Sequence, residues 1–86
     1  MGDKKPKLEM NVFYHPLDPY KEEIQNLLDK VVQGGIAKIR SMLPHDDCYT
    51  IYAHYPAKFV PGSTSQSHYG PTAVKYFLNA LLEKYG

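Results

Sequence analysis

Disulfide bridges within the chain are excluded, because Cys48 is the only cysteine among its 86 residues. A small domain without a covalent staple favours a reducing compartment, and we expect a cytoplasmic protein. No apolar run approaches the roughly 18 residues of a membrane span. The charged stretch at the N-terminus lacks the apolar core of a secretory signal. We therefore expect neither a membrane anchor nor a secreted protein.

Excess charge of one sign is also missing. Ten basic and nine acidic side chains give a formal net charge of +1, and Arg40 supplies the only guanidinium group. Proteins that bind nucleic acids usually concentrate positive charge on one surface. The stretch YTIYAHYPAKF does place aromatic rings next to His54 and Lys58, as a base-stacking surface would. The balance of charge nevertheless argues against a nucleic-acid partner.

The residues that metal binding and catalysis require are present without the spacing that these functions need. The segment HDDC at residues 45–48 holds three ligand types, but no second pair of ligands follows it. Cys48 with His54, or His68 with a nearby serine, matches no local signature of a nucleophile and its base. Asp46 and Asp47 oppose thiolate formation at Cys48. We expect no metal, no cofactor and no enzymatic activity.

Periodic apolar residues predict the main elements of the chain. Its length suits one domain, which we place at residues 8–86 after a flexible tail at 1–7. Alternation and strand-favouring residues predict strands over Leu8–His15 and Cys48–Tyr55. Apolar stripes at helical spacing predict two helices, one opened by Asp18 and Pro19 and the other by Gly70 and Pro71.

The segment from Ile36 to Leu43 fits both a helix and a strand. Ile36, Ile39 and Leu43 keep helical spacing, which slightly favours a short helix, but the same run also suits one strand of a hairpin. Either choice gives an α+β fold. We expect a small two-layer domain with one short, mostly antiparallel sheet and two or three helices packed on one face.

Residues 48–55 predict two different faces for one strand. Tyr49, Ile51, Ala53 and Tyr55 form the more apolar set, which we expect to pack against the helices. The other set presents a thiol, a hydroxyl, a phenol and an imidazole, from Cys48, Thr50, Tyr52 and His54. This face is either an open contact surface or the ordinary polar side of an antiparallel sheet.

The segment VPGSTSQSHYGPT at residues 60–72 is rich in small polar residues and precedes a helix. We predict a surface loop, because such residues favour turns. An alternative is a site for a phosphate-bearing ligand or nucleotide at residues 62–70, since helix N-termini attract anions. Its candidate residues are Ser63, Thr64, Ser65, Ser67, His68, Tyr69, Thr72 and Lys75.

Tyrosine is the most distinctive residue type, with eight in the chain and no tryptophan. Tyrosine is favoured at contact surfaces, because a rigid ring loses little entropy and its hydroxyl can form hydrogen bonds. We therefore predict a non-catalytic interaction module, such as an adaptor, inhibitor or regulator, that binds a protein partner. The expected contact residues are Tyr52, His54, His68 and Tyr69, and a homodimer is a further candidate.

Overall fold

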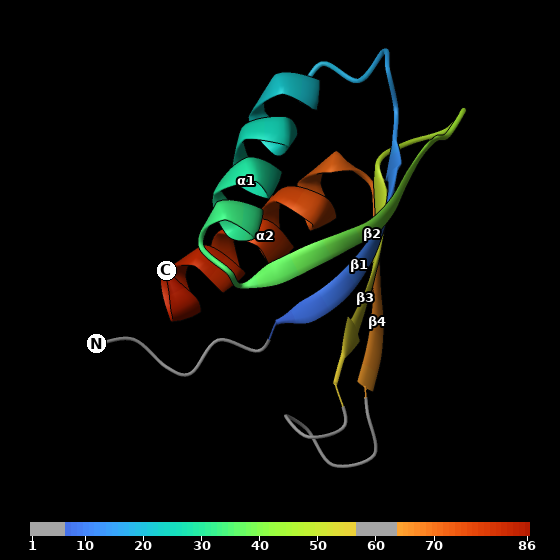
Figure 1. Cartoon of the computed structure of the whole chain (residues 1–86). Helices are drawn as coiled ribbons and strands as arrows, with labels where there is room; N and C mark the ends of the chain where they lie inside the picture. Colours follow the sequence, from blue (N-terminus) through green and yellow to red (C-terminus); the bar gives the residue numbers. More distant parts are fainter. Residues whose placement is uncertain (1–6, 57–63) are drawn as a thin grey trace.

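The described chain forms one sheet of four strands together with two helices (Figure 1). The computed structural model describes residues 7–56 and 64–86. Most of the predicted tail at 1–7, and Ser63 of the predicted ligand site, lie outside the described residues. The elements in chain order are β1 (Leu8–Tyr14), α1 (Lys21–Gln33), β2 (Ala37–Pro44), β3 (Thr50–Tyr55), β4 (Thr64–Tyr69) and α2 (Pro71–Tyr85).

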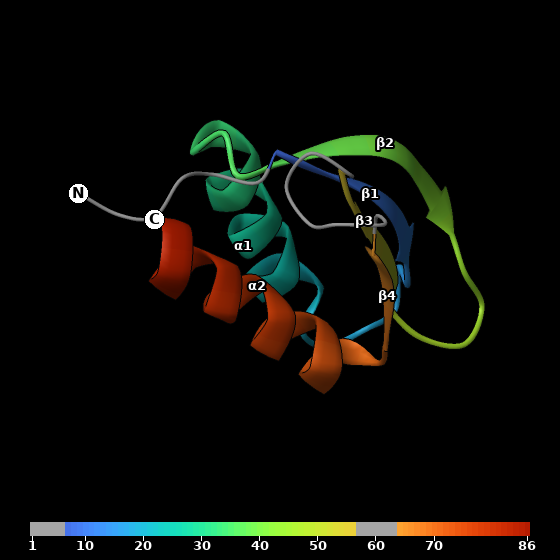
Figure 2. The ribbon, with the colours of Figure 1, turned by 90° about the horizontal axis from the view of Figure 1, so that it is seen from below.

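The sheet is mixed and has the strand order β2-β1-β3-β4. β1 and β2 are parallel and are joined by α1, whereas β3 is antiparallel to both β1 and β4. Both helices lie on the same face of the sheet, as the two perpendicular views show (Figures 1 and 2). The predicted α+β class is confirmed, with two helices on one side and two antiparallel pairings out of three.

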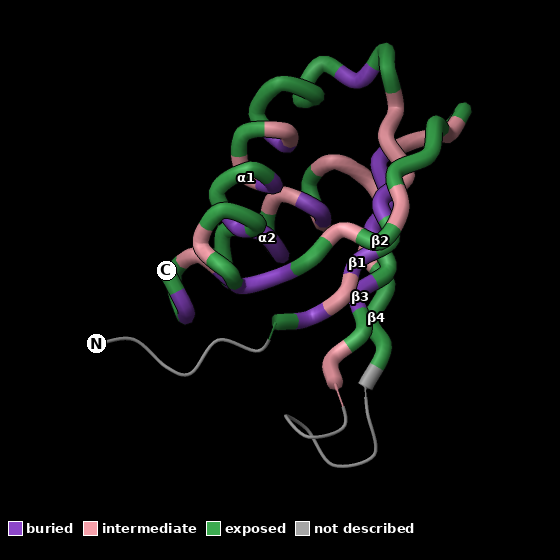
Figure 3. Tube along the Cα trace, in the orientation of Figure 1, coloured by how far each residue is buried: buried purple, intermediate pink, exposed green. Residues whose placement is uncertain are grey.

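The core lies between this sheet and the two helices (Figure 3). The predicted alternation of both strands holds: in β1 the side chains of Leu8, Met10 and Val12 are buried. Of the predicted apolar set in residues 48–55, Tyr49, Ile51 and Ala53 are buried and Tyr55 is half-buried. Each helix adds its apolar stripe, and the buried helix residues are Ile24, Leu28, Val31, Val74, Phe77, Leu78, Leu81 and Tyr85.

The slight preference for a helix over Ile36–Leu43 is wrong, because Ala37–Pro44 forms β2. α1 ends at Gln33, and Gly35 takes the left-handed conformation, with φ of 74°, that redirects the chain. β2 then runs parallel to β1 and pairs with the edge of β1 that faces away from β3. A helix here would leave that side of β1 without hydrogen bonds, so pairing decides what periodicity left open.

The predicted loop at residues 60–72 is also wrong where it is described, since Thr64–Tyr69 forms β4. All six residues pair with β3, from Thr50 opposite Tyr69 to Tyr55 opposite Thr64. Serine, glutamine and histidine are not strong strand formers. The strand exists because β3 offers a free row of backbone groups, which a loop composition does not reveal.

The two helix starts differ from each other. α2 begins at Pro71, as predicted, where the missing N–H of proline costs nothing. α1 begins at Lys21 and not at Pro19. Asp18 acts one turn earlier, because its Oδ1 accepts a hydrogen bond of 2.8 Å from the backbone N–H of Tyr20. Asp18 therefore fixes the turn that enters the helix.

Candidate functional site

Both described helices, α1 and α2, cover one face of the sheet, and we call the opposite face the open face. Its side chains come from all four strands, because alternate residues of each strand point away from the helices. A register shift in the β1–β2 pairing makes Arg40 an extra residue, so Arg40 and Ser41 both reach β1 side chains on this face. The open face consists of Glu9, Asn11, Phe13, Lys38, Arg40, Ser41, Leu43, Tyr52, His54, Ser65, Ser67 and Tyr69.

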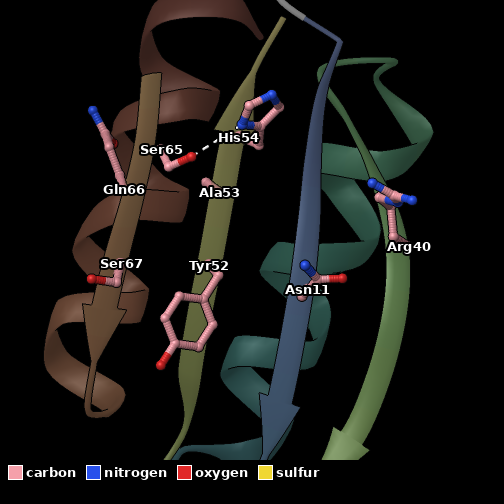
Figure 4. Close-up of a pocket in the computed structure, with 8 residues that line it drawn as sticks. All are labelled: Asn11, Arg40, Tyr52, Ala53, His54, Ser65, Gln66 and Ser67. Carbon is pink, nitrogen blue, oxygen red and sulfur yellow. Dashed lines mark hydrogen bonds between the residues drawn. The ribbon is translucent and has the colours of Figure 1, made fainter. Parts of the chain in front are cut away.

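A hollow of about 520 Å³ lies on the open face (Figure 4). Across its β3–β4 side, His54 Nδ1 and Ser65 Oγ are 3.0 Å apart and form a hydrogen bond. Most of the lining side chains are exposed, so the hollow is a depression in a surface and not an enclosed chamber. The lining residues are Asn11, Arg40, Tyr52, Ala53, His54, Ser65, Gln66 and Ser67.

Aromatic rings form a cluster beside the hollow, which we call the aromatic cluster: Phe13, His45, Tyr52 and Tyr69. The ring of Phe13 meets those of Tyr52 and His45 edge to face, with centroids 5.6 and 6.0 Å apart. Tyr52 and Tyr69 are also edge to face at 6.0 Å, and their hydroxyl oxygens are 2.9 Å apart. Such contacts restrict the orientations of the rings.

Tyr52 and Tyr69 remain accessible despite these contacts. Tyr52 keeps 40% of its surface exposed and Tyr69 keeps 62%. Their mutual hydrogen bond raises the pKa of Tyr52, because it favours the protonated phenol. The pair presents two aromatic rings with a rim of two hydroxyl groups.

The open face holds few charged side chains: Glu9, Lys38 and Arg40. Arg40 Nη1 lies 3.2 Å from Glu9 Oε2, and both side chains are largely exposed. Arg40 is the only fully charged residue among the eight that line the hollow. An exposed ion pair of this kind contributes little stability, but it offsets the positive charge of the face. The face therefore lacks the concentrated positive charge that a polyanion would need.

The structure brings together half of the predicted site residues on the open face. Tyr52 stands opposite Ser67 and His54 opposite Ser65, while Tyr69 closes the aromatic end. The predicted opposite face of residues 48–55 is exposed at Tyr52 and His54. It is closed at its start, because Thr50 is buried and the half-buried Cys48 Sγ lies 3.9 Å from Thr50 Oγ1.

The other predicted residues lie elsewhere. His68 points to the helix side, where its ring stacks on Phe77 with centroids 4.0 Å apart and planes at 18°. Thr72 is exposed in the first turn of α2. Lys75 Nζ lies 3.0 Å from Glu23 Oε2 and 4.2 Å from the ring centre of Tyr20. Ser65 and Ser67 thus share no face with His68 and Lys75.

Sequence reasoning missed the β1 and β2 residues of this surface and the neighbouring His45; Asn11, Phe13 and Arg40 are examples. The alternation over Leu8–His15 already placed Asn11 and Phe13 on one side, but gave no reason to single them out. Arg40 lies within Ile36–Leu43, and its face could not be predicted because that segment fits both a helix and a strand. His45 reaches the aromatic cluster from the turn between β2 and β3, and no periodicity marks a turn residue.

The contact between Ser65 and His54 has the distance of a nucleophile and its base. In known hydrolytic sites a third group orients the histidine. Within residues 7–56 and 64–86, no acidic side chain contacts His54. The same ranges hold no group of three or more histidine, cysteine, aspartate or glutamate side chains that could bind a metal ion. The absence of catalytic activity stays a prediction.

No protein-family model, curated protein or solved structure matches this chain. No helix in the described part of the chain is long and apolar enough to cross a membrane.

Stability should fall as the pH decreases, because of His68. Its Nε2 is buried and has no hydrogen-bond partner within residues 7–56 and 64–86, and desolvation lowers the pKa of His68 below the usual 6.5. The unfolded chain then binds the proton first as the pH falls through 6.5 and continues downward, so protonation favours unfolding. Above that pH both states are neutral, and the contribution to stability is complete.

Urea unfolding across this pH range measures the effect. We expect a smaller pH dependence in His68→Phe, which keeps an aromatic ring on Phe77 but binds no proton. An equal pH dependence in the variant and the parent chain would contradict the prediction and assign the effect to other groups.

Proposed function

We propose that this chain is a non-catalytic interaction module that binds a protein partner through its open face. The observation that carries the proposal is the exposed pair of Tyr52 and Tyr69, held by Phe13 and set beside the hollow. Tyrosine side chains dominate binding energy at many protein interfaces. An adaptor, an inhibitor and a regulator all fit such a surface.

The composition of the open face supports a protein partner in particular. Tyrosine, serine and asparagine also dominate the contact surfaces of antibodies, where rigid rings supply area and small polar groups adapt their hydrogen bonds. Here Tyr52 and Tyr69 supply the rings, while Asn11, Ser65 and Ser67 supply the small polar groups. The ion pair of Arg40 with Glu9 suits a polar rim.

The phosphate-bearing ligand proposed for residues 62–70 remains the alternative hypothesis, with weaker support. It relied on hydroxyl groups near the start of α2 together with Lys75. Ser65 and Ser67 lie on the open face, and Lys75 is paired with Glu23. A single half-buried Cys48 is compatible with the reducing cytoplasm that we propose as the location.

Replacing Tyr52 and Tyr69 together by alanine tests the proposal. Interface tyrosines that act as hot spots contribute about 2 kcal/mol or more each, which is roughly a 30-fold loss of affinity. The chain is immobilised as bait for proteins from its own cells, and each retained protein is purified. Its affinity for the parent chain and for the variant is then measured by calorimetry.

Tyr76→Ala is the matched control, because Tyr76 is 79% exposed on α2, away from the open face. We expect a partner that binds the parent chain and Tyr76→Ala alike and loses affinity for the double variant. Circular dichroism checks that all three chains keep their fold. A partner whose affinity is unchanged by the double variant would remove the open face as the binding surface.

A further inference from the structure

The two edges of the sheet differ in how they are protected against pairing. Strand edges expose unpaired backbone groups, and proteins usually cover them or protect them with charges, prolines and bulges. The β2 edge has all three of these features: Lys38 and Arg40, a register shift at Arg40, and Pro44 at its end. An added strand would meet charge and irregular backbone on this side.

The β4 edge has none of these features. Its residues, TSQSHY, include no lysine, arginine, aspartate, glutamate or proline. Its pairing with β3 runs in one register from end to end, without a bulge. β4 is thus a regular edge without protective side chains in the described sheet, and such an edge is a template for another strand.

The hydrogen bonds determine which groups of β4 point outward. Gly70 donates its N–H to the carbonyl oxygen of Tyr49 at 2.7 Å, which continues the β3–β4 ladder by one pair. Hydrogen-bonded and non-hydrogen-bonded pairs alternate along an antiparallel ladder. His68 and Gln66 therefore bond to β3, whereas the backbone groups of Ser65, Ser67 and Tyr69 point away from the sheet.

We propose that two copies of this chain pair through β4, antiparallel and centred on Ser67, so that one sheet runs through both. The three outward-pointing residues are symmetric about Ser67, so a two-fold axis there uses all of them. Ser67 then faces Ser67 of the second copy, and Ser65 faces its Tyr69.

Charge explains why a second copy suits this edge. Like charges directly opposite each other destabilise a strand pair, and any charge on a symmetric edge meets its own kind. β4 carries no acidic or basic side chain besides His68, which is stacked on Phe77. Small hydroxyl side chains opposite one another are favourable neighbours across strands. The β2 edge, with Lys38 and Arg40, would repel its own copy.

The dimer would enlarge the open face. Ser65 and Ser67 line the hollow in each copy, so pairing through β4 places two hollows side by side on the same face of the joined sheet. The edge pairs through the outward backbone groups of β4, whereas the open face presents side chains, including those of Ser65, Ser67 and Tyr69. Each can fail its own test without affecting the other, because one test reads the mass of the chain alone and the other reads the affinity for a partner.

Ser67→Pro tests the pairing. Proline removes the outward N–H, which makes no bond to β3, and strand edges tolerate proline at such positions. Sedimentation should give the mass of two chains for the parent and the mass of one for Ser67→Pro. Ser67→Ala keeps the N–H and should remain a dimer. A parent chain that sediments as a monomer at every concentration would overturn the proposal.

Amide hydrogen exchange of the parent chain keeps the test decisive if Ser67→Pro does not fold. The amides of Ser65, Ser67 and Tyr69 should exchange more slowly as the protein concentration rises, because dimerisation buries them. Exchange that stays equally fast at all concentrations would overturn the proposal. Protection that appears only after another protein is added would also overturn it, since a different strand would then occupy the edge.

Discussion

Ile51→Ala is expected to lower the free energy of unfolding by about 2–5 kcal/mol, the range for removing a large aliphatic side chain from a core. Ile51 is fully buried in β3, with Val12 of β1 beside it and the helices above it. Its replacement leaves a cavity that the sheet cannot close, because β3 is paired on both sides. A domain of this length has only about 4–13 kcal/mol of stability, so the loss is a large share of the total.

Urea unfolding at pH 7 measures this change, with Leu17→Ala as the control. Leu17 is exposed in the turn before α1, and its replacement should stay within about 0.5 kcal/mol of the parent. If Ile51→Ala costs no more than Leu17→Ala, the core is not packed between sheet and helices as described. The slope of the unfolding curve should stay the same, since both variants expose similar surface on unfolding.

The sequence predicts four of the six elements because their apolar residues repeat with one clear period. In β1 the alternation of Leu8, Met10 and Val12 has no helical reading, and the stripes of α1 and α2 have no strand reading. β2 was ambiguous because Ile36, Ile39 and Leu43 keep helical spacing, while the same short run also suits one strand of a hairpin. Its strand state comes from pairing with β1, a contact between segments that are distant along the chain.

β4 was missed for a related reason. Its side chains give no apolar alternation, since Ser65, Ser67 and Tyr69 face solvent and only His68 packs against α2. An edge strand can take polar residues on both faces where the helix layer does not fully cover it. Local composition then resembles that of a loop, and only the presence of β3 alongside makes it a strand.

The sequence could predict which side chains of one strand share a face, but it could not predict which side chains of different strands are in contact. Tyr52 and His54 follow from parity within residues 48–55. The contacts of Tyr52 with Phe13 and Tyr69 depend on registers between three strands, which the sequence alone does not specify. His68 was predicted as a contact residue in a loop beside that strand, but it lies in β4 with the opposite parity to Ser67 and Tyr69, and its ring stacks on Phe77 of α2.

Gly70→Ala is expected to destabilise the chain by about 1–3 kcal/mol through backbone strain alone. Gly70 joins β4 to α2 with φ of 90° and ψ of 156°, a conformation found almost only in glycine. The backbone cannot relax easily, because the N–H of Gly70 bonds to Tyr49 and its carbonyl accepts from Val74. A methyl group at this position would meet no atom of residues 7–56 and 64–86 within 4 Å, so crowding by them is not the cause.

A chain made by chemical synthesis with D-alanine at position 70 separates strain from every other effect of the methyl group. The mirror-image side chain accepts a positive φ without strain, and it also reduces the freedom of the unfolded chain. Thermal unfolding should therefore show a lower midpoint for L-alanine and a midpoint at or above that of the parent for D-alanine. Equal losses with both forms would contradict the assignment to φ. They would trace the loss to the added methyl group itself, and the turn from β4 into α2 would then not depend on glycine for its conformation.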